Sequence, residues 1–259
     1  MATWDQRGTG HSHPELDPTA TYTFGSAVDD TIAVVEYLRD RFGQDKVYLV
    51  GQSWETILGV ATAQARPDLF HAYMGTGQMV SPTETDRIFY ADTLARARET
   101  GRDGLAATLL EIGSPPYDSI LDNEPALKWE PEVSPLDHSA NSEAMGGFSE
   151  NILVEEYALI DQVHLFAGFL DTFNVLYPQL RLIDFRHQAT SLEVPVQLVQ
   201  GAHEADGRAL LADEWFAMLD APSKDLVRLD TSGHRPLFQQ PDEFVDYMVE
   251  SVLPGEDGS

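Results

Sequence analysis

The sequence contains no cysteine, only three lysines and no long apolar run. Without cysteine the protein can form no disulfide and offers no thiol nucleophile or thiolate metal ligand. No stretch of about 18 apolar residues is present, so we expect no transmembrane helix and no membrane partner. The opening residues, MATWDQRGTG, have no basic stretch followed by an apolar one. We therefore expect no signal peptide and a cytoplasmic location.

Basic residues are also scarce as a class, with 16 Lys and Arg against 43 Asp and Glu and a formal charge of −27. Phosphates would be repelled by this charge, so we expect neither nucleic acid nor an anionic membrane as a partner. A solvated acidic surface is the simplest explanation. The chain has 259 residues, of which 42% are hydrophobic, enough for one α/β domain or one domain with an insertion.

Apolar periodicity predicts strands alternating with helices at both ends of the chain, and helices alone between them. This pattern is typical of a parallel α/β sheet with a helical insertion. We predict a core formed by residues 1–80 and 191–259 and a helical cap over residues 81–190, including a helix that stops at Pro178. The expected strands are Lys46–Val50, His71–Thr76, Val194–Val199 and Asp225–Leu229, and the expected core helices are Ser26–Phe42, Thr56–Arg66, Arg208–Leu219 and Asp242–Val252.

The stretch KVYLVGQSWETILGV, residues 46–60, contains a candidate nucleophile. An apolar strand reaches Gly51, Ser53 follows two residues later, and a helix begins directly after it. A strand, a sharp turn that carries a serine, and a helix form a nucleophile elbow, in which small residues let the strand and helix pass closely. Serine is also among the best helix N-caps, so a capping role is the alternative for Ser53.

Two later segments supply the other groups of a possible catalytic triad. Glu204 and Asp206 follow the strand VPVQLV, and His234 lies in a glycine-containing loop after the last predicted strand. Serine, acid and histidine, each after a strand, is the chain order of α/β-hydrolase triads. The residues therefore predict a triad of Ser53, His234 and one of the two acids.

Four motifs are distributed along the chain: WDQRGTGHS, GQSW, VPVQLVQGAHE and TSGHRPLFQQPDEF. With these motifs the sequence resembles the prolyl aminopeptidase (proline iminopeptidase) branch of the α/β-hydrolases, over almost the entire chain. The resemblance implies a serine hydrolase that needs no cofactor and cleaves an amide or ester of a small molecule or short peptide through an acyl-enzyme. It implies Ser53 as the nucleophile, His234 as the general base and Glu204 as the acid, with Asp206 as the alternative acid.

The same resemblance implies roles for three residues near the triad. The amide N–H of Trp54 would donate to the oxyanion that forms when the substrate is attacked. Asp5 and Arg7 belong to the Asp-Gln-Arg-Gly turn of the family, and we expect them to brace the site as a buried ion pair.

One departure from the family lies at the N-terminus. Family members carry strands and a His-Gly-Gly-Pro-Gly-like loop before the Asp-Gln-Arg-Gly turn, whereas Asp5 is the fifth residue here. We therefore expect an N-terminally truncated hydrolase that lacks the second oxyanion donor, a loss that typically costs about 2.7–4 kcal/mol. The strand VYLV would become an unpaired sheet edge, so we expect a four-stranded remnant that is either marginally stable or completed by pairing into a homodimer.

A second departure is Glu55, which stands where an elbow usually has glycine. Overpacking of a tight site costs roughly 1–3 kcal/mol, whereas a carboxylate in the first helical turn gains only about 0.3–1 kcal/mol from the helix dipole. We therefore expect the helix to shift outward. The alternative function is a catalytically impaired or inactive homologue that binds a ligand or partner.

Two further groups of residues are weaker candidates for a functional role. His11 and His13 alternate as in some metal sites, but no neighbouring carboxylate or cysteine supports them, so we expect no metal. Acidic residues of the predicted cap could bind a substrate amine, as cap glutamates do in the resembled aminopeptidases, or form a solvated helix face. They are Glu84, Asp86, Glu155, Glu156 and Asp161.

Overall fold

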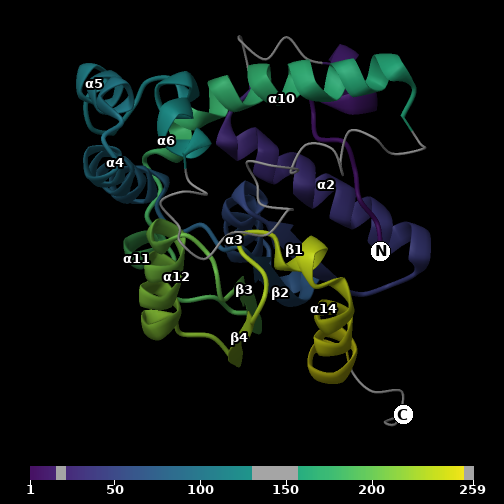
Figure 1. The fold of residues 1–259 in the computed structure, drawn as a ribbon. Helices are drawn as coiled ribbons and strands as arrows, with labels where there is room; N and C mark the ends of the chain where they lie inside the picture. Colours follow the sequence, from purple (N-terminus) through teal and green to yellow (C-terminus); the bar gives the residue numbers. More distant parts are fainter. Residues whose placement is uncertain (16–21, 130–156, 254–259) are drawn as a thin grey trace.

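Four parallel strands form a single sheet in the computed structural model, which describes residues 1–15, 22–129 and 157–253. The strands pair in the order β1-β2-β3-β4 (Figure 1). Each lies within two residues of its predicted bounds, so the predicted parallel α/β fold is confirmed. The strands are β1 (Val47–Gln52), β2 (Phe70–Thr76), β3 (Val196–Gly201) and β4 (Lys224–Leu229).

Helices cover both faces of the sheet. Alternate residues of a strand point to opposite faces, so neighbours in β2 belong to different cores: Tyr73 packs with residues of α2, α3 and α12, and Met74 packs with Phe244 of α14. All four predicted core helices are present. The last of them is α-helical only to Tyr247, and the chain then forms a π-helical turn, η4 (Met248–Val252). Their bounds are α2 (Phe24–Phe42), α3 (Trp54–Ala65), α12 (Asp206–Met218) and α14 (Pro241–Tyr247).

Helices also fill the chain between β2 and β3. In Figure 1, α4, α5 and α6 gather on one side while α10 runs across the top of the view. The helix α10 continues through Pro178, so the predicted stop there is wrong. Because proline removes only one backbone donor, the helix can include it near its C-terminal end, and it ends two residues later, at Leu180. The proposed cap boundaries at 81 and 190 stay a prediction. The helices are α4 (Pro82–Glu99), α5 (Asp103–Ile112), α6 (Glu124–Lys128), α10 (Leu159–Leu180) and α11 (Phe185–Gln188).

The remaining elements are short. None of the helices in the described part of the chain combines the length and the apolar character needed to cross a bilayer. The short elements are the 3-10 turns η1 (Gly10–Glu15), η2 (Pro67–Leu69) and η3 (Ile120–Asp122), and the one-turn helix α13 (Pro236–Gln239).

The N-terminal turn lies directly against α10. A Cβ added to Gly168 of α10 would lie 1.9 Å from the carbonyl oxygen of Gly8, so the two backbones are in contact. Beside this contact, the imidazole ring of His13 stacks on that of His164, with ring centroids 4.2 Å apart. The two histidines of the HSH motif thus pack against α10, His13 through His164 and His11 through its contact with Asp161.

The substitution Gly168→Ala should lower the free energy of unfolding by roughly 1–3 kcal/mol, because the new methyl group has no room beside Gly8. Urea unfolding followed by circular dichroism measures the change. Gly104→Ala in α5 is the matched control, since a Cβ there meets nothing within 4 Å; it should be neutral or stabilising. Equal effects of the two substitutions would contradict the close contact.

The strand β1 lies at one edge of the sheet that the described residues form, as predicted for VYLV. Its Val50 is 38% exposed, and an exposed apolar edge strand of this kind can pair with another chain. The homodimer stays a prediction.

Sedimentation velocity should show a dimer for the unmodified protein and a monomer for Val50→Lys, because an edge lysine opposes strand pairing. Val249→Lys, at an exposed position of η4, serves as control; an unmodified protein that is monomeric throughout would exclude this dimer.

Candidate active site

Ser53 occupies a strained turn between β1 and α3. Its backbone φ of 57° makes it the one non-glycine residue with positive φ in the described part of the chain. Residues with a side chain rarely adopt such angles, and strain of this kind clusters at functional sites. The Ser53 side chain makes no capping hydrogen bond to α3. The alternative of a helix N-cap is therefore wrong.

The strand and helix of this turn pass very close to each other. A Cβ on Gly51 would lie 2.7 Å from the carbonyl oxygen of Glu55 and 3.0 Å from the Cα of Thr56. The expected outward shift of the helix is therefore wrong. The reason is that only the Glu55 backbone meets Gly51, while the Glu55 side chain is half-buried in the first turn of α3. Position 55, two residues after the serine, therefore tolerates glutamate, whereas position 51 requires glycine.

Backbone and hydroxyl hydrogen bonds fix the turn to the neighbouring strand. The amide of Ser53 donates to the carbonyl of Thr76 at 3.0 Å. The buried hydroxyl of Thr56 donates to the Ser53 carbonyl and accepts from the amide of Met79 at 2.9 Å. These bonds hold the serine at the carboxyl ends of β1 and β2.

The side chains of Ser53, His234 and Glu204 form one continuous hydrogen-bonded row. The Nε2 atom of His234 is 2.8 Å from the Ser53 Oγ, and its Nδ1 atom is 2.6 Å from a carboxylate oxygen of Glu204. The His234 and Glu204 side chains are almost completely buried. A general base must lie within hydrogen-bond reach of the proton that it removes, and His234 meets that condition for the Ser53 hydroxyl.

The loop that carries His234 is held by groups that the sequence did not single out. The side-chain amide of Gln52 donates to the His234 carbonyl at 2.9 Å, and the other end of that amide accepts from the Thr76 hydroxyl. A Cβ on Gly77 would lie 2.4 Å from the same His234 carbonyl. The missed signal was the small residue directly after β2, because close backbone approach requires glycine.

The buried acid of the row is Glu204. Its second oxygen, Oε1, accepts from the Nε of Arg208 at 2.8 Å and from the amide of Ala205 at 2.9 Å. Burial alone would raise the pKa of Glu204, but the charge of Arg208, and then that of His234, lower this pKa to about 2. Asp206, the alternative acid, is exposed at the start of α12 and lies outside the row.

Asp5 and Arg7 do not form the expected buried ion pair. The Arg7 guanidinium pairs instead with Asp30 of α2, and its side chain is 39% exposed. The Asp5 carboxylate accepts from the hydroxyl of Tyr157 and, at 2.8 Å, from the amide of His11. The prediction of a pair is wrong because each residue has partners of its own, and none of these partners belongs to the triad.

The acidic residues of the predicted cap occupy different environments. Asp86 is buried and accepts from Asn123 at 2.6 Å and from the hydroxyl of Tyr177, and burial raises its pKa to about 6. Glu84 pairs with Arg87 at the surface. The ring of His11 lies between Asp161, at 3.4 Å, and Asp5, at 3.5 Å. Glu155 and Glu156 lie outside the described residues.

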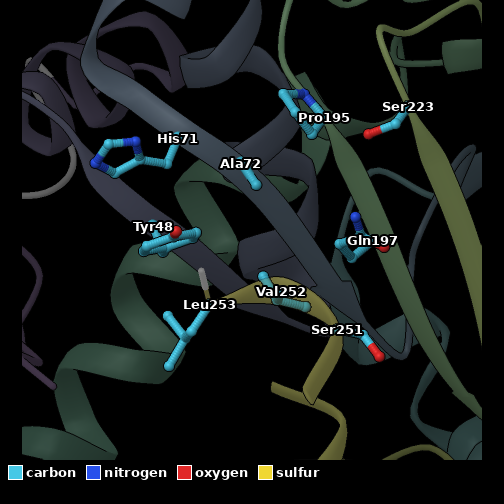
Figure 2. Close-up of a pocket in the computed structure, with 9 residues that line it drawn as sticks. All are labelled: Tyr48, His71, Ala72, Pro195, Gln197, Ser223, Ser251, Val252 and Leu253. Carbon is cyan, nitrogen blue, oxygen red and sulfur yellow. The ribbon is translucent and has the colours of Figure 1, made fainter. Parts of the chain in front are cut away.

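A pocket lies near the amino ends of the strands, whereas the row of Ser53, His234 and Glu204 lies at their carboxyl ends. Tyr48, Ala72 and Gln197, all near the starts of their strands, line it together with Ser251 and Leu253 (Figure 2). Since the strands are parallel, this pocket and the row of three side chains are at opposite ends of the sheet. Within the described residues, no group of three or more His, Asp or Glu side chains is placed to hold a metal ion.

Comparison with known proteins identifies the family of the chain. The sequence profile described as the alpha/beta hydrolase fold matches residues 2–241. The "Probable aminopeptidase YbaC" of Bacillus subtilis (strain 168) is 26% identical over 256 residues, which cover 94% of this chain and 76% of that protein.

Two solved structures have a similar fold. A thermophilic esterase from Thermogutta terrifontis matches with a TM-score of 0.57 at 16% identity, over 94% of this chain and 76% of its own. A proline iminopeptidase from Mycobacterium smegmatis matches with a TM-score of 0.54 at 15% identity, with the same coverage of both chains. At these identities the structures support the fold alone.

The low pKa of Glu204 predicts how stability changes in acid. A carboxyl group whose pKa falls from its usual 4.5 to about 2 on folding stabilises the protein above pH 4.5, and this contribution is lost as the pH falls toward 2. Glu204→Gln should therefore be less stable at neutral pH, because it removes the buried carboxylate charge that Arg208 contacts at 2.8 Å. Its stability should also fall less steeply below pH 4.5.

Urea unfolding at several pH values between 7 and 3 measures both effects. Glu111→Gln, at an exposed position near the end of α5, is the control and should keep the pH dependence of the unmodified protein. An unchanged acid slope in Glu204→Gln would show that the Glu204 carboxylate is not specially stabilised by the fold.

Proposed function

The chain belongs to the α/β-hydrolase family, and we propose that it is a serine hydrolase that cleaves an amide or ester of a small molecule or short peptide. The observation that carries the proposal is the 2.8 Å contact between the Ser53 Oγ and His234 Nε2, with Glu204 on the other ring nitrogen. A serine next to a histidine that is oriented by a buried acid is the arrangement that activates a hydroxyl for nucleophilic attack.

In the proposed reaction, the Ser53 Oγ attacks the substrate carbonyl carbon while His234 removes the hydroxyl proton. Glu204 holds the imidazole so that Nδ1 carries the proton and Nε2 accepts. The bond to the leaving amine or alcohol then breaks, and His234 returns the proton to that group. Water, deprotonated by the same imidazole, hydrolyses the acyl-enzyme and restores the free serine.

The oxyanion formed by this attack needs hydrogen-bond donors. Trp54 directly follows the nucleophile and is the first residue of α3. In the nucleophile elbow the amide of that residue donates to the oxyanion, and the positive end of the helix dipole adds to the stabilisation. We assign Trp54 this role.

The proposed substrate class is that of an aminopeptidase, which removes a residue from the amino end of a short peptide. The similarity to a relative named as a probable aminopeptidase supports it. Specificity for proline, which only the resemblance to prolyl aminopeptidases suggests, and the cytoplasmic location expected from the sequence remain parts of the proposal.

Ser53→Ala should lower the hydrolysis of prolyl and alanyl p-nitroanilides and of p-nitrophenyl acetate by a factor on the order of 10⁴ or more, because no other group can form the acyl-enzyme. Release of the chromophore measures the rate. Ser251→Ala is the matched control, since this exposed serine lines the pocket at the opposite ends of the strands; its activity should be unchanged.

Equally low rates of chromophore release for the unmodified protein and Ser53→Ala would favour the alternative function, that of a homologue that binds a ligand or partner without hydrolysis. A fluorophosphonate probe separates a wrong substrate from an inactive serine. Labelling of Ser53 without turnover of the test substrates would overturn only the substrate class. No labelling at Ser53 would overturn the hydrolase proposal itself.

A further inference from the structure

A buried arginine supports the acid of the triad from the side that faces away from His234. Arg208 is 4% exposed, and its Nε lies 2.8 Å from Oε1 of Glu204. The other carboxylate oxygen, Oε2, contacts the His234 ring at 2.6 Å. Since the amide of Ala205 also donates to Oε1, one oxygen is fixed by two donors and the other is left to the histidine.

The arginine itself has little freedom to move. Its guanidinium lies over the ring of Phe89, a buried residue of α4, with Cζ 4.9 Å from the ring centroid. The preceding residue, Gly207, approaches α4 so closely that a Cβ would lie 3.1 Å from both Phe89 and the Thr85 carbonyl oxygen. The hydroxyl of Thr85 donates to the Gly207 carbonyl. The arginine is therefore clamped between Glu204 and the α4 helix.

The charge of Arg208 acts on the whole row. A buried carboxylate beside an imidazole favours the protonated ring, which cannot act as a base. A fixed positive charge on the far side of that carboxylate opposes this effect, and arginine is suited to the task because it does not lose its proton inside proteins. Removal of the guanidinium would leave the Glu204 charge to act on His234 alone.

We propose that Arg208 is a positioning residue of the triad, which fixes the orientation of Glu204 and keeps His234 available as a base near neutral pH. The inference rests on the proposed serine hydrolase function. It assigns to α4 an indirect part in the chemistry, because α4 supplies the ring and the backbone contacts that hold the arginine in place.

Arg208→Gln tests the inference through the pH dependence of kcat/KM on the best p-nitroanilide or p-nitrophenyl substrate. The acid limb of the pH profile of kcat/KM should move to higher pH by about one pH unit. The reason is that the imidazole is protonated more easily when the guanidinium no longer opposes the charge of the Glu204 carboxylate. Activity should thus fall more at pH 6 than at pH 8. Arg208→Lys keeps the charge and should return the limb most of the way toward that of the unmodified protein.

Leu109→Ala is the matched control, because Leu109 is buried in the same helical cluster as Phe89 but is not one of the residues that hold the arginine. It should lower stability and leave the acid limb in place. A purely structural role for Arg208 predicts the same result for Arg208→Gln: lower stability with no movement of the limb. That result would overturn the inference.

A second measurement does not depend on turnover. The protonation midpoint of the His234 ring can be followed by NMR in histidine-labelled protein, with its signal assigned by loss in His234→Asn. The midpoint should rise in Arg208→Gln and stay near the original value in Arg208→Lys. An unchanged midpoint would overturn the inference even if the enzyme is active, whereas a raised midpoint in a protein without hydrolase activity would uphold the electrostatic effect and reject only the proposed function.

Discussion

The close approach of α3 to β1 is the constraint on which the rest of the site depends. It is possible because position 51 has no side chain, so the Glu55 carbonyl oxygen can lie only 2.7 Å from the place that a Cβ would occupy. This contact forces the chain through the unusual backbone angles of Ser53 and directs the hydroxyl toward the loop after β4. Parallel strands then add the remaining geometry, because their carboxyl ends lie at one edge and bring the loops after β3 and β4 to the same place.

The two buried acids of the described structure show how the surroundings decide the state of a carboxyl group. Glu204 is in direct contact with a cation, and its pKa is lowered to about 2 although it is buried. Asp86 has two neutral donors, Asn123 and Tyr177, with Arg208 acting only through its charge, and its pKa rises to about 6. Arg208 therefore acts on both acids, on Glu204 through direct contact and on Asp86 through its charge.

The sequence predicted the strands well because each is a short apolar run bounded by turn residues, a local signal. It predicted Ser53, Glu204 and His234 as a group, because the order of these residues and their positions after strands can also be read from the sequence. It was wrong about Asp5 and Arg7, whose partners Tyr157 and Asp30 lie far along the chain. It was also wrong about Glu55, since the sequence does not tell whether a backbone or a side chain fills the contact with Gly51.

Sequence by itself determined the class of fold, the order of the candidate groups and the turn that presents the serine, because these follow from local patterns of apolar, small and polar residues. Only the tertiary structure decided that the Ser53 hydroxyl meets His234 instead of capping α3, and that Glu204 and not Asp206 faces the ring. It alone revealed Gln52 and Arg208 as supports. The physical reason is distance along the chain: Ser53 and His234 are separated by 181 positions, and a contact of 2.8 Å between them exists only once the sheet has aligned the ends of its strands.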